Sequence, residues 1–246
     1  MSTEQQHLTK KERIKLKQQN KEAVHEQRKA AKKTQKNFVY VFLTLATLLI
    51  IFGFWKSSPD VVTEVISPTT LLQVQSDDWA KGNLGAKVTL IEYLDFECGA
   101  CGAYYPLVQR LVNEYGDRVH FITRYFPLPG HKNGMNSALA VESAGMQGKY
   151  WEMQDLLFRE QESWGNSLSP NPSLFTHYAN QLGLNMEQFA QDTNSSEVKN
   201  RVARDRDSGN KLGVNATPTF FLNGKKLENP RGYEAFKALL DDALKQ

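Results

Sequence analysis

The chain has 246 residues, of which 40% are hydrophobic and 23% are charged, and its formal net charge at pH 7 is +3. This is the composition of an ordinary globular protein, and it excludes a chain that is polar and disordered throughout. The charge is unevenly spread. Residues 1–37 contain eleven Lys and Arg against four acidic residues, whereas the rest contains nineteen against twenty-three. The basic excess therefore belongs to one segment. Such an asymmetry is a signal of how the chain is oriented in a membrane, more than a signal of a binding partner.

That basic segment, residues 1–37, is too polar to build a core. We expect it to be a cytoplasmic topogenic tail, with binding to anionic lipid or nucleic acid as the alternative. Residues 38–55 (FVYVFLTLATLLIIFGFW) carry no charge, and as a helix they would extend about 27 Å, enough to cross a bilayer. The flanking charges predict an uncleaved single-pass signal anchor in the cell membrane, with the C-terminal part extracytoplasmic. A cleaved signal peptide and a buried core helix are the alternatives.

Residues 56–76 are rich in Ser, Thr and Pro and are interpreted as a tether to one compact domain, residues 77–246. Within that domain, residues 87–94 (KVTLIEYL) have the apolar, β-rich pattern of a buried strand. Apolar residues at helical spacing then predict a helix that ends near Gly116. Residues 118–126 predict a second strand, so the three elements form a β-α-β unit with parallel strands.

The remainder of the domain changes from helical to extended patterns and back. Residues 131–213 are predicted to be mostly helical, because apolar side chains recur at helical spacing. Residues 217–227 (TPTFFLNGKKL) predict a β-hairpin around the turn Asn223-Gly224. Residues 232–245 close the chain as an amphipathic helix. The predicted fold is therefore α/β, a mixed sheet flanked by helices and interrupted by a helical subdomain, preceded by one transmembrane helix.

The only two cysteines, Cys98 and Cys101, stand in a C-x-x-C motif directly after the first predicted strand. As a structural clip they would close a very small loop, worth about 2 kcal/mol against nearly 5 kcal/mol for a loop of about 100 residues. A zinc site needs further ligands, and His120, His131 and His177 show no paired spacing. We expect no bound metal. A redox role remains, because a cysteine at a helix N-terminus is stabilised as a thiolate.

The position of each cysteine predicts its role. Cys98 precedes the helix and is expected to be the exposed nucleophile, and Cys101, one turn into the helix, the resolving thiol. Glu92 lies in the middle of the apolar strand, where it is either a proton acceptor for Cys101 or an acid that reaches solvent or pairs with a lysine. Pro218 opens a predicted strand, either as an ordinary entry proline or in a cis peptide bond.

Four separated motifs resemble the DsbA-like branch of the thioredoxin superfamily over residues 77–246. They are GAKVTLIEYLDFECGAC, VHFITRYFPLPGH, ALAVESAGMQGKYWEMQDLLF and VNATPTFFLNGKKL. The resemblance implies a thioredoxin fold with an inserted helical subdomain and a cis Thr217–Pro218 bond facing the cysteines, beside which substrate chain pairs. It also implies that Glu92 is the family's buried acid and relays protons. The resemblance to membrane-anchored members of this branch implies that the cysteine pair is reoxidised by a quinone-linked membrane partner of the DsbB or vitamin-K-epoxide-reductase type.

The residues between the cysteines, Gly99 and Ala100, depart from the Pro-His pair of the strong oxidants in this family. With no cationic neighbour and with Glu97 adjacent, we predict that the pKa of Cys98 is nearer that of thioredoxin, about 7, than that of DsbA, about 3.5.

The predicted function is an extracytoplasmic oxidoreductase that donates its Cys98–Cys101 disulfide to folding secreted or surface proteins. We expect no cofactor beyond this disulfide, with quinone acting only indirectly through the membrane partner, no nucleic-acid partner, and a monomer. The alternatives are a membrane-anchored reductase or isomerase that is kept as a dithiol, and a non-catalytic peptide-binding module.

Overall fold

The computed structural model describes residues 67–246 without a break and, ahead of them, residues 42–50 with scattered residues and residue pairs between 17 and 52. The chain divides into two units, Met1–Glu64 and Val65–Gln246. In the first unit residues 42–50 are helical. None of the helices formed by described residues is long and apolar enough to cross a membrane. The predicted tail and anchor lie largely outside the described residues, so both stay predictions.

The second unit is built on one mixed sheet with the strand order β1-β3-β2-β4-β5. The central strands β2 and β3 are parallel, as predicted, and every side chain of β3 is buried. Strands β1 and β4 run antiparallel to their central neighbours, and β5 pairs with β4 across the predicted Asn223-Gly224 turn. The strands are β1 (Trp79–Gly82), β2 (Val88–Leu94), β3 (Val119–Tyr125), β4 (Thr219–Leu222) and β5 (Lys225–Lys226).

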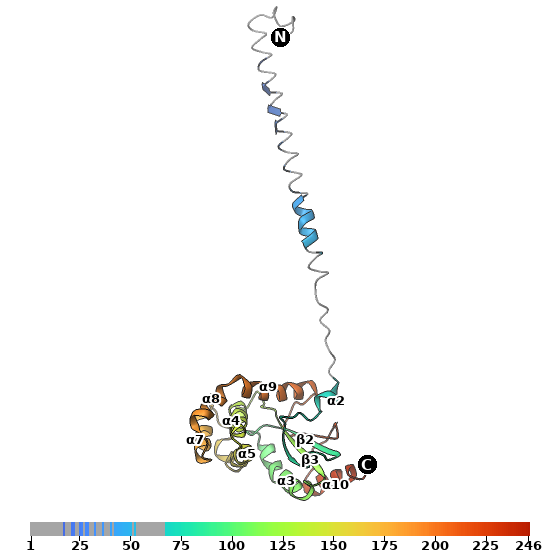
Figure 1. Ribbon diagram of the computed structural model, residues 1–246, viewed down its shortest axis with the longest axis vertical. Helices are drawn as coiled ribbons and strands as arrows, with labels where there is room; N and C mark the ends of the chain where they lie inside the picture. The colour runs from blue at the N-terminus through green and yellow to red at the C-terminus, as the bar shows by residue number, and fades with distance from the viewer. Residues whose placement is uncertain are drawn as a thin grey trace, which may run out of the picture. The chain divides into compact units, whose positions relative to one another are not determined.

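Helices cover both faces of this sheet (Figure 1). Helices α3 (Gly99–Tyr115) and α10 (Tyr233–Ala243) pack on one face. The other face is covered by Leu72, which precedes β1, and by the end of α9 (Ser196–Lys211). Because side chains alternate between the faces of a strand, β2 contributes to both cores. The core under α3 and α10 consists of Val88, Leu90, Leu111, Tyr115, Val119, Phe121, Phe220, Leu222, Tyr233, Phe236 and Leu240.

A run of helices from α4 to α9 separates β3 from β4, which confirms the inserted helical subdomain. These helices gather beside one end of the sheet in Figure 1 and share a core with the cysteine segment. The helices that precede α9 in this insertion are α4 (Gly134–Met146), α5 (Tyr150–Arg159), α6 (Gln161–Trp164), α7 (Pro172–Gln181) and α8 (Met186–Asn194).

The compact unit begins earlier than the sequence pattern suggests. Residues 67–76, predicted as part of a tether, contain the short helix α2 (Pro68–Leu71), and Leu72 lies in the core. Arg124 of β3 fixes this segment through its guanidinium, which donates to the carbonyl oxygens of Leu71 at 2.6 Å and Gln73 at 2.7 Å. The tether prediction fails here because the partner is a side chain more than fifty residues away.

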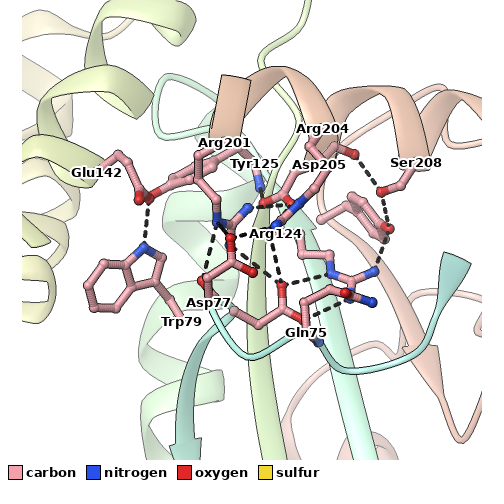
Figure 2. A network of polar contacts seen from close by, with 12 residues as sticks. Gln75, Asp77, Trp79, Arg124, Tyr125, Glu142, Arg201, Arg204, Asp205 and Ser208 are labelled. Carbon is pink, nitrogen blue, oxygen red and sulfur yellow. Dashed lines mark hydrogen bonds and ion pairs between the residues drawn. The ribbon is translucent and has the colours of Figure 1, made fainter. Parts of the chain in front are cut away.

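A buried polar network joins this N-terminal segment, the sheet and the insertion (Figure 2). Arg124 donates to both carboxylate oxygens of Asp78, at 3.2 and 2.8 Å, and these two side chains are 3% and 0% exposed. Arg201 of α9 lies 3.5 Å from Asp78 and pairs with Asp205. The Asp205 carboxylate in turn accepts the backbone N–H of Tyr125. Buried charges are tolerated when they are paired in this way, so the network holds α9 against the sheet.

Candidate active site

The two cysteines lie where β2 ends and α3 begins. Cys98 is the residue that caps α3, and Cys101 lies within its first turn. The residue Cys98 is 9% exposed and Cys101 is 0% exposed, and both are free thiols in this structure. A buried strand that delivers the chain to a helix N-terminus therefore places one sulfur near the surface and the other inside. Both cysteines are buried, so the predicted exposure of Cys98 is small, although Cys98 is the more accessible of the two.

The pKa of the Cys98 thiol is lowered to about 5. The main cause is the hydrogen bond that the Cys101 side chain makes to the Cys98 sulfur. Burial opposes this effect, and the backbone N–H groups of Cys101 and Ala100 support it. Hydrogen bonds that favour the charged form lower the pKa of an acid. The thiolate is thus stabilised by hydrogen bonds, chiefly the one from the Cys101 side chain, without a cationic side chain.

This result does not confirm the prediction of a pKa close to that of thioredoxin. A value of about 5 lies between the values of about 7 for thioredoxin and about 3.5 for DsbA. The expected opposition from Glu97 is absent for a geometric reason. The Glu97 carboxylate is engaged elsewhere, because it accepts the backbone N–H of Asn133 at 2.5 Å.

Burial raises the pKa of the Cys101 thiol well above its usual range, and the nearby Cys98 and Glu92 add to the effect. Glu92 points toward the face of β2 that α3 covers, because it alternates with Ile91 and Tyr93 of the opposite core. Burial raises the pKa of Glu92 to about 8. At neutral pH this carboxyl group therefore holds a proton close to the buried sulfur.

Glu92 also borders a small cavity of about 20 Å³, lined in part by Lys81 and Gln109, which is space for about one water molecule. Lys81 does not pair with Glu92 within the part of the chain that the structure describes. Its ammonium group donates to Gln109 at 3.0 Å and lies 4.5 Å from the ring centre of Trp151. The alternative interpretation of Glu92 as one half of a lysine ion pair is therefore not realised.

Replacing Glu92 with glutamine is expected to change how stability depends on pH. The folded pKa of about 8 lies above the ordinary value of 4.5, so the stabilising contribution is complete below pH 4.5 and is lost as the pH rises through about 8. Wild type should therefore lose on the order of 3–4 kcal/mol between pH 5 and pH 8 that the glutamine variant keeps. Urea unfolding of both proteins at pH 5 and pH 8 measures this. Parallel losses in the two proteins would show that Glu92 is not a buried acid.

The loop before β4 faces the cysteines from the other side. The Thr217–Pro218 peptide bond is cis, and the carbonyl oxygen of Thr217 accepts a hydrogen bond from the Cys98 thiol at 3.2 Å. The structure therefore brings Cys98, Cys101 and the Thr217–Pro218 loop together, with Glu92 behind the buried sulfur. The roles of these residues stay predictions.

Sequence reasoning missed two side chains that hold the segment between β2 and α3. Gln161 of α6 donates from Nε2 to the carbonyl oxygens of Phe96 at 2.6 Å and Cys98 at 3.0 Å. The carboxylate of Asp95 binds His131 at 2.6 Å, whereas the sequence suggests His131 only as a possible metal ligand. The residues of each pair are 36 or more positions apart in the sequence, so no local sequence pattern predicts these contacts.

A dithiol at a strand-to-helix junction, opposite a cis-proline loop in a mixed sheet, defines a thioredoxin-like protein of the DsbA type. A family model described as thioredoxin matches residues 75–242. The chain belongs to this thioredoxin family.

Solved structures agree with this assignment. A thioredoxin-like oxidoreductase from Silicibacter pomeroyi is 27% identical with a TM-score of 0.60, over 70% of this chain and 95% of that one. BdbD from Bacillus subtilis is 25% identical with a TM-score of 0.59, over 68% and 92%. The fold of alpha-DsbA1 from Wolbachia pipientis is also similar, with a TM-score of 0.66 at 23% identity over 73% and 96%.

Curated relatives share only a part of their length with this chain. A Na(+)/H(+) antiporter NhaA 3 from Salinispora tropica is 35% identical over 167 residues, which are 68% of this chain and 24% of that protein. A Na(+)/H(+) antiporter NhaA 1 from Mycolicibacterium gilvum is 35% identical over 182 residues, 72% and 28%. The chain thus spans about a quarter of the length of these relatives. The structural neighbours, and not these names, suggest thiol-disulfide oxidoreductase activity.

Proposed function

We propose that this protein is a thiol-disulfide oxidoreductase that passes a Cys98–Cys101 disulfide to the thiols of folding secreted or surface proteins. The observation that carries the proposal is the asymmetry of the two thiols. The pKa of the outer one, Cys98, is lowered to about 5, whereas the pKa of the buried Cys101 is raised. A low-pKa thiolate is a good leaving group, which favours release of Cys98 from a mixed disulfide and hence donation of the disulfide.

The reaction begins with the oxidised chain. A substrate thiolate attacks the Cys98 sulfur, a bond forms between the two sulfurs, the Cys98–Cys101 bond breaks, and the electron pair leaves on Cys101. Glu92, which holds its proton up to about pH 8, supplies a proton to the Cys101 thiolate. A second substrate thiolate then attacks the substrate sulfur of the mixed disulfide and releases Cys98 as a thiolate. The substrate is oxidised by two electrons and the chain is reduced by two.

The Thr217–Pro218 loop is the proposed place where the substrate chain docks. The carbonyl oxygen of Thr217 already faces the Cys98 sulfur at 3.2 Å. A substrate strand that lies along this loop would bring its own sulfur to the same place. Backbone pairing of this kind is independent of side-chain identity, which suits an enzyme that serves many unfolded clients.

The sequence supports a place for this reaction. The uncharged run 38–55 and the basic residues before it support a single-pass anchor in the cell membrane, with the catalytic unit on the extracytoplasmic side. We propose a quinone-linked membrane protein of the DsbB or vitamin-K-epoxide-reductase type as the reoxidant. The disulfide itself then serves as the redox group of this chain.

A transfer assay with the full-length chain tests the proposed function. The oxidised chain is mixed with reduced, unfolded ribonuclease, with glutathione disulfide as the terminal oxidant. We expect the substrate thiols to disappear over many turnovers of the chain. If the reduced chain instead cleaves insulin disulfides while the oxidised chain leaves reduced ribonuclease unchanged, the protein works as a reductase.

A further inference from the structure

The segment that leads into the C-x-x-C motif is clamped to the loop that follows β3. The Asp95 carboxylate accepts the backbone N–H of Glu97 at 2.9 Å and that of Leu128 at 2.8 Å, and its second oxygen also binds His131 Nδ1 at 2.6 Å. The Glu97 carboxylate binds the same loop two residues after His131, where it accepts the backbone N–H of Asn133. Two buried carboxylates thus fix the chain immediately ahead of the first cysteine.

Asp95 also contacts both cysteines through its backbone. Its carbonyl oxygen accepts the N–H of Cys98 at 3.0 Å. Its own N–H donates to the sulfur of Cys101, which lowers the pKa of that thiol against the effect of burial. The side chain of this one residue is therefore held by the loop, while its two peptide groups hold the two reactive residues.

His131 is the side chain that completes the carboxylate's set of donors. The Asp95 side chain is 0% exposed, and the His131 ring reaches it from the solvent side with 26% of its surface exposed. A carboxylate only accepts hydrogen bonds, so Nδ1 of His131 is the donor. Hydrogen bonds to an ionised acceptor are about twice as strong as neutral ones. Loss of this donor would leave the buried carboxylate with only its two backbone donors, the N–H groups of Glu97 and Leu128, and so hold Asp95 less firmly.

We propose that His131 is a positioning residue for disulfide transfer, which acts by holding Asp95 so that the Asp95 peptide N–H stays on the Cys101 sulfur. The inference rests on the proposed function. When a substrate thiolate attacks Cys98, the electron pair of the broken bond goes to Cys101, and a fixed N–H donor stabilises the negative charge there. A better leaving group makes the disulfide easier to reduce.

The reduction potential of the full-length chain in glutathione buffers tests this proposal. His131→Ala is expected to shift the equilibrium about tenfold toward the disulfide form, or about 30 mV toward a more negative potential. His131→Asn keeps an N–H donor at the same distance from the backbone and should restore the wild-type potential. His177→Ala removes an exposed histidine of α7 and should change nothing.

The outcomes separate this proposal from the proposed function. If the wild-type chain does not equilibrate with glutathione through its two cysteines, the proposed function is wrong. If it does, and the folded alanine variant keeps the wild-type potential within about twofold in the equilibrium constant, the positioning role is overturned. An equal shift in the asparagine variant would also overturn it, because the donor would then not matter. Should the alanine variant not fold, His131→Phe fills the space of the ring without a donor and makes the same comparison.

Discussion

Cys98→Ser is expected to lower disulfide transfer to the uncatalysed background. Cys98 is 9% exposed and its pKa is about 5, whereas Cys101 is 0% exposed and its pKa is raised. Substrate sulfur therefore reaches only Cys98, and only Cys98 forms a thiolate at neutral pH. Because serine carries no sulfur and its hydroxyl does not ionise in this range, both the attack and the mixed disulfide are lost.

Cys101→Ser is the matched control for this experiment. The variant keeps the nucleophile but lacks the thiol that resolves the intermediate, so incubation with a disulfide-bonded protein should accumulate a mixed disulfide at Cys98. Non-reducing electrophoresis measures the trapped species. Trapping by the Cys98→Ser variant through Cys101 would reverse the assigned roles. A double variant that still replaces the wild type in cells would point to a peptide-binding module instead.

The largest effect on stability is expected for Arg124→Met. Removing one member of a buried ion pair leaves an uncompensated charge, which costs about 3–5 kcal/mol. Asp78, 0% exposed, would keep only the longer charge contacts with Arg201 at 3.5 Å and Arg204 at 3.9 Å, and the backbone N–H of Gln75 at 2.9 Å. The N-terminal segment would also lose the two carbonyl contacts that the guanidinium makes. Urea unfolding at pH 7 measures the difference.

Arg159→Met provides the comparison on the surface. Its partner Asp155 lies at 3.1 Å, but the two side chains are 58% and 53% exposed. Exposed pairs contribute about 0–1 kcal/mol, so this variant should unfold nearly like the wild type. Equal losses in the two arginine variants would mean that the buried network does not hold the insertion against the sheet.

The sequence predicts those parts of the fold that repeat a pattern locally. The parallel strands β2 and β3, the hairpin turn at Asn223-Gly224 and the place of the cysteines all follow from short stretches with clear periodicity or turn chemistry. Strand β1 (Trp79–Gly82) was not predicted, because four residues with a lysine and a glycine show no alternation. Its place at the edge of the sheet depends on pairing with β3.

The site divides in the same way. The buried acid can be recognised from the strand that carries it, and the C-x-x-C motif from its place shortly after that strand. The pKa of Cys98 could not, because the Glu97 carboxylate, next to it in sequence, binds the backbone N–H of Asn133, and the Cys98 sulfur is stabilised mainly by the Cys101 side chain. The clamp formed by Asp95 and His131 joins residues 36 positions apart. The presence of a charged residue next to a thiol in the sequence therefore does not predict the pKa of that thiol when the charged side chain can bind a group far away in the sequence.

The reduction potential of the Cys98–Cys101 pair in the full-length chain tests the central claim most directly. The pKa of Cys98 lies between those of thioredoxin and DsbA, so the reduced form is stabilised to an intermediate degree. We expect a value between about −120 and −180 mV, in the range of DsbA and protein disulfide isomerase. A value near about −270 mV, that of thioredoxin, would contradict the direction of electron flow that we propose and would make this protein a reductase of its clients.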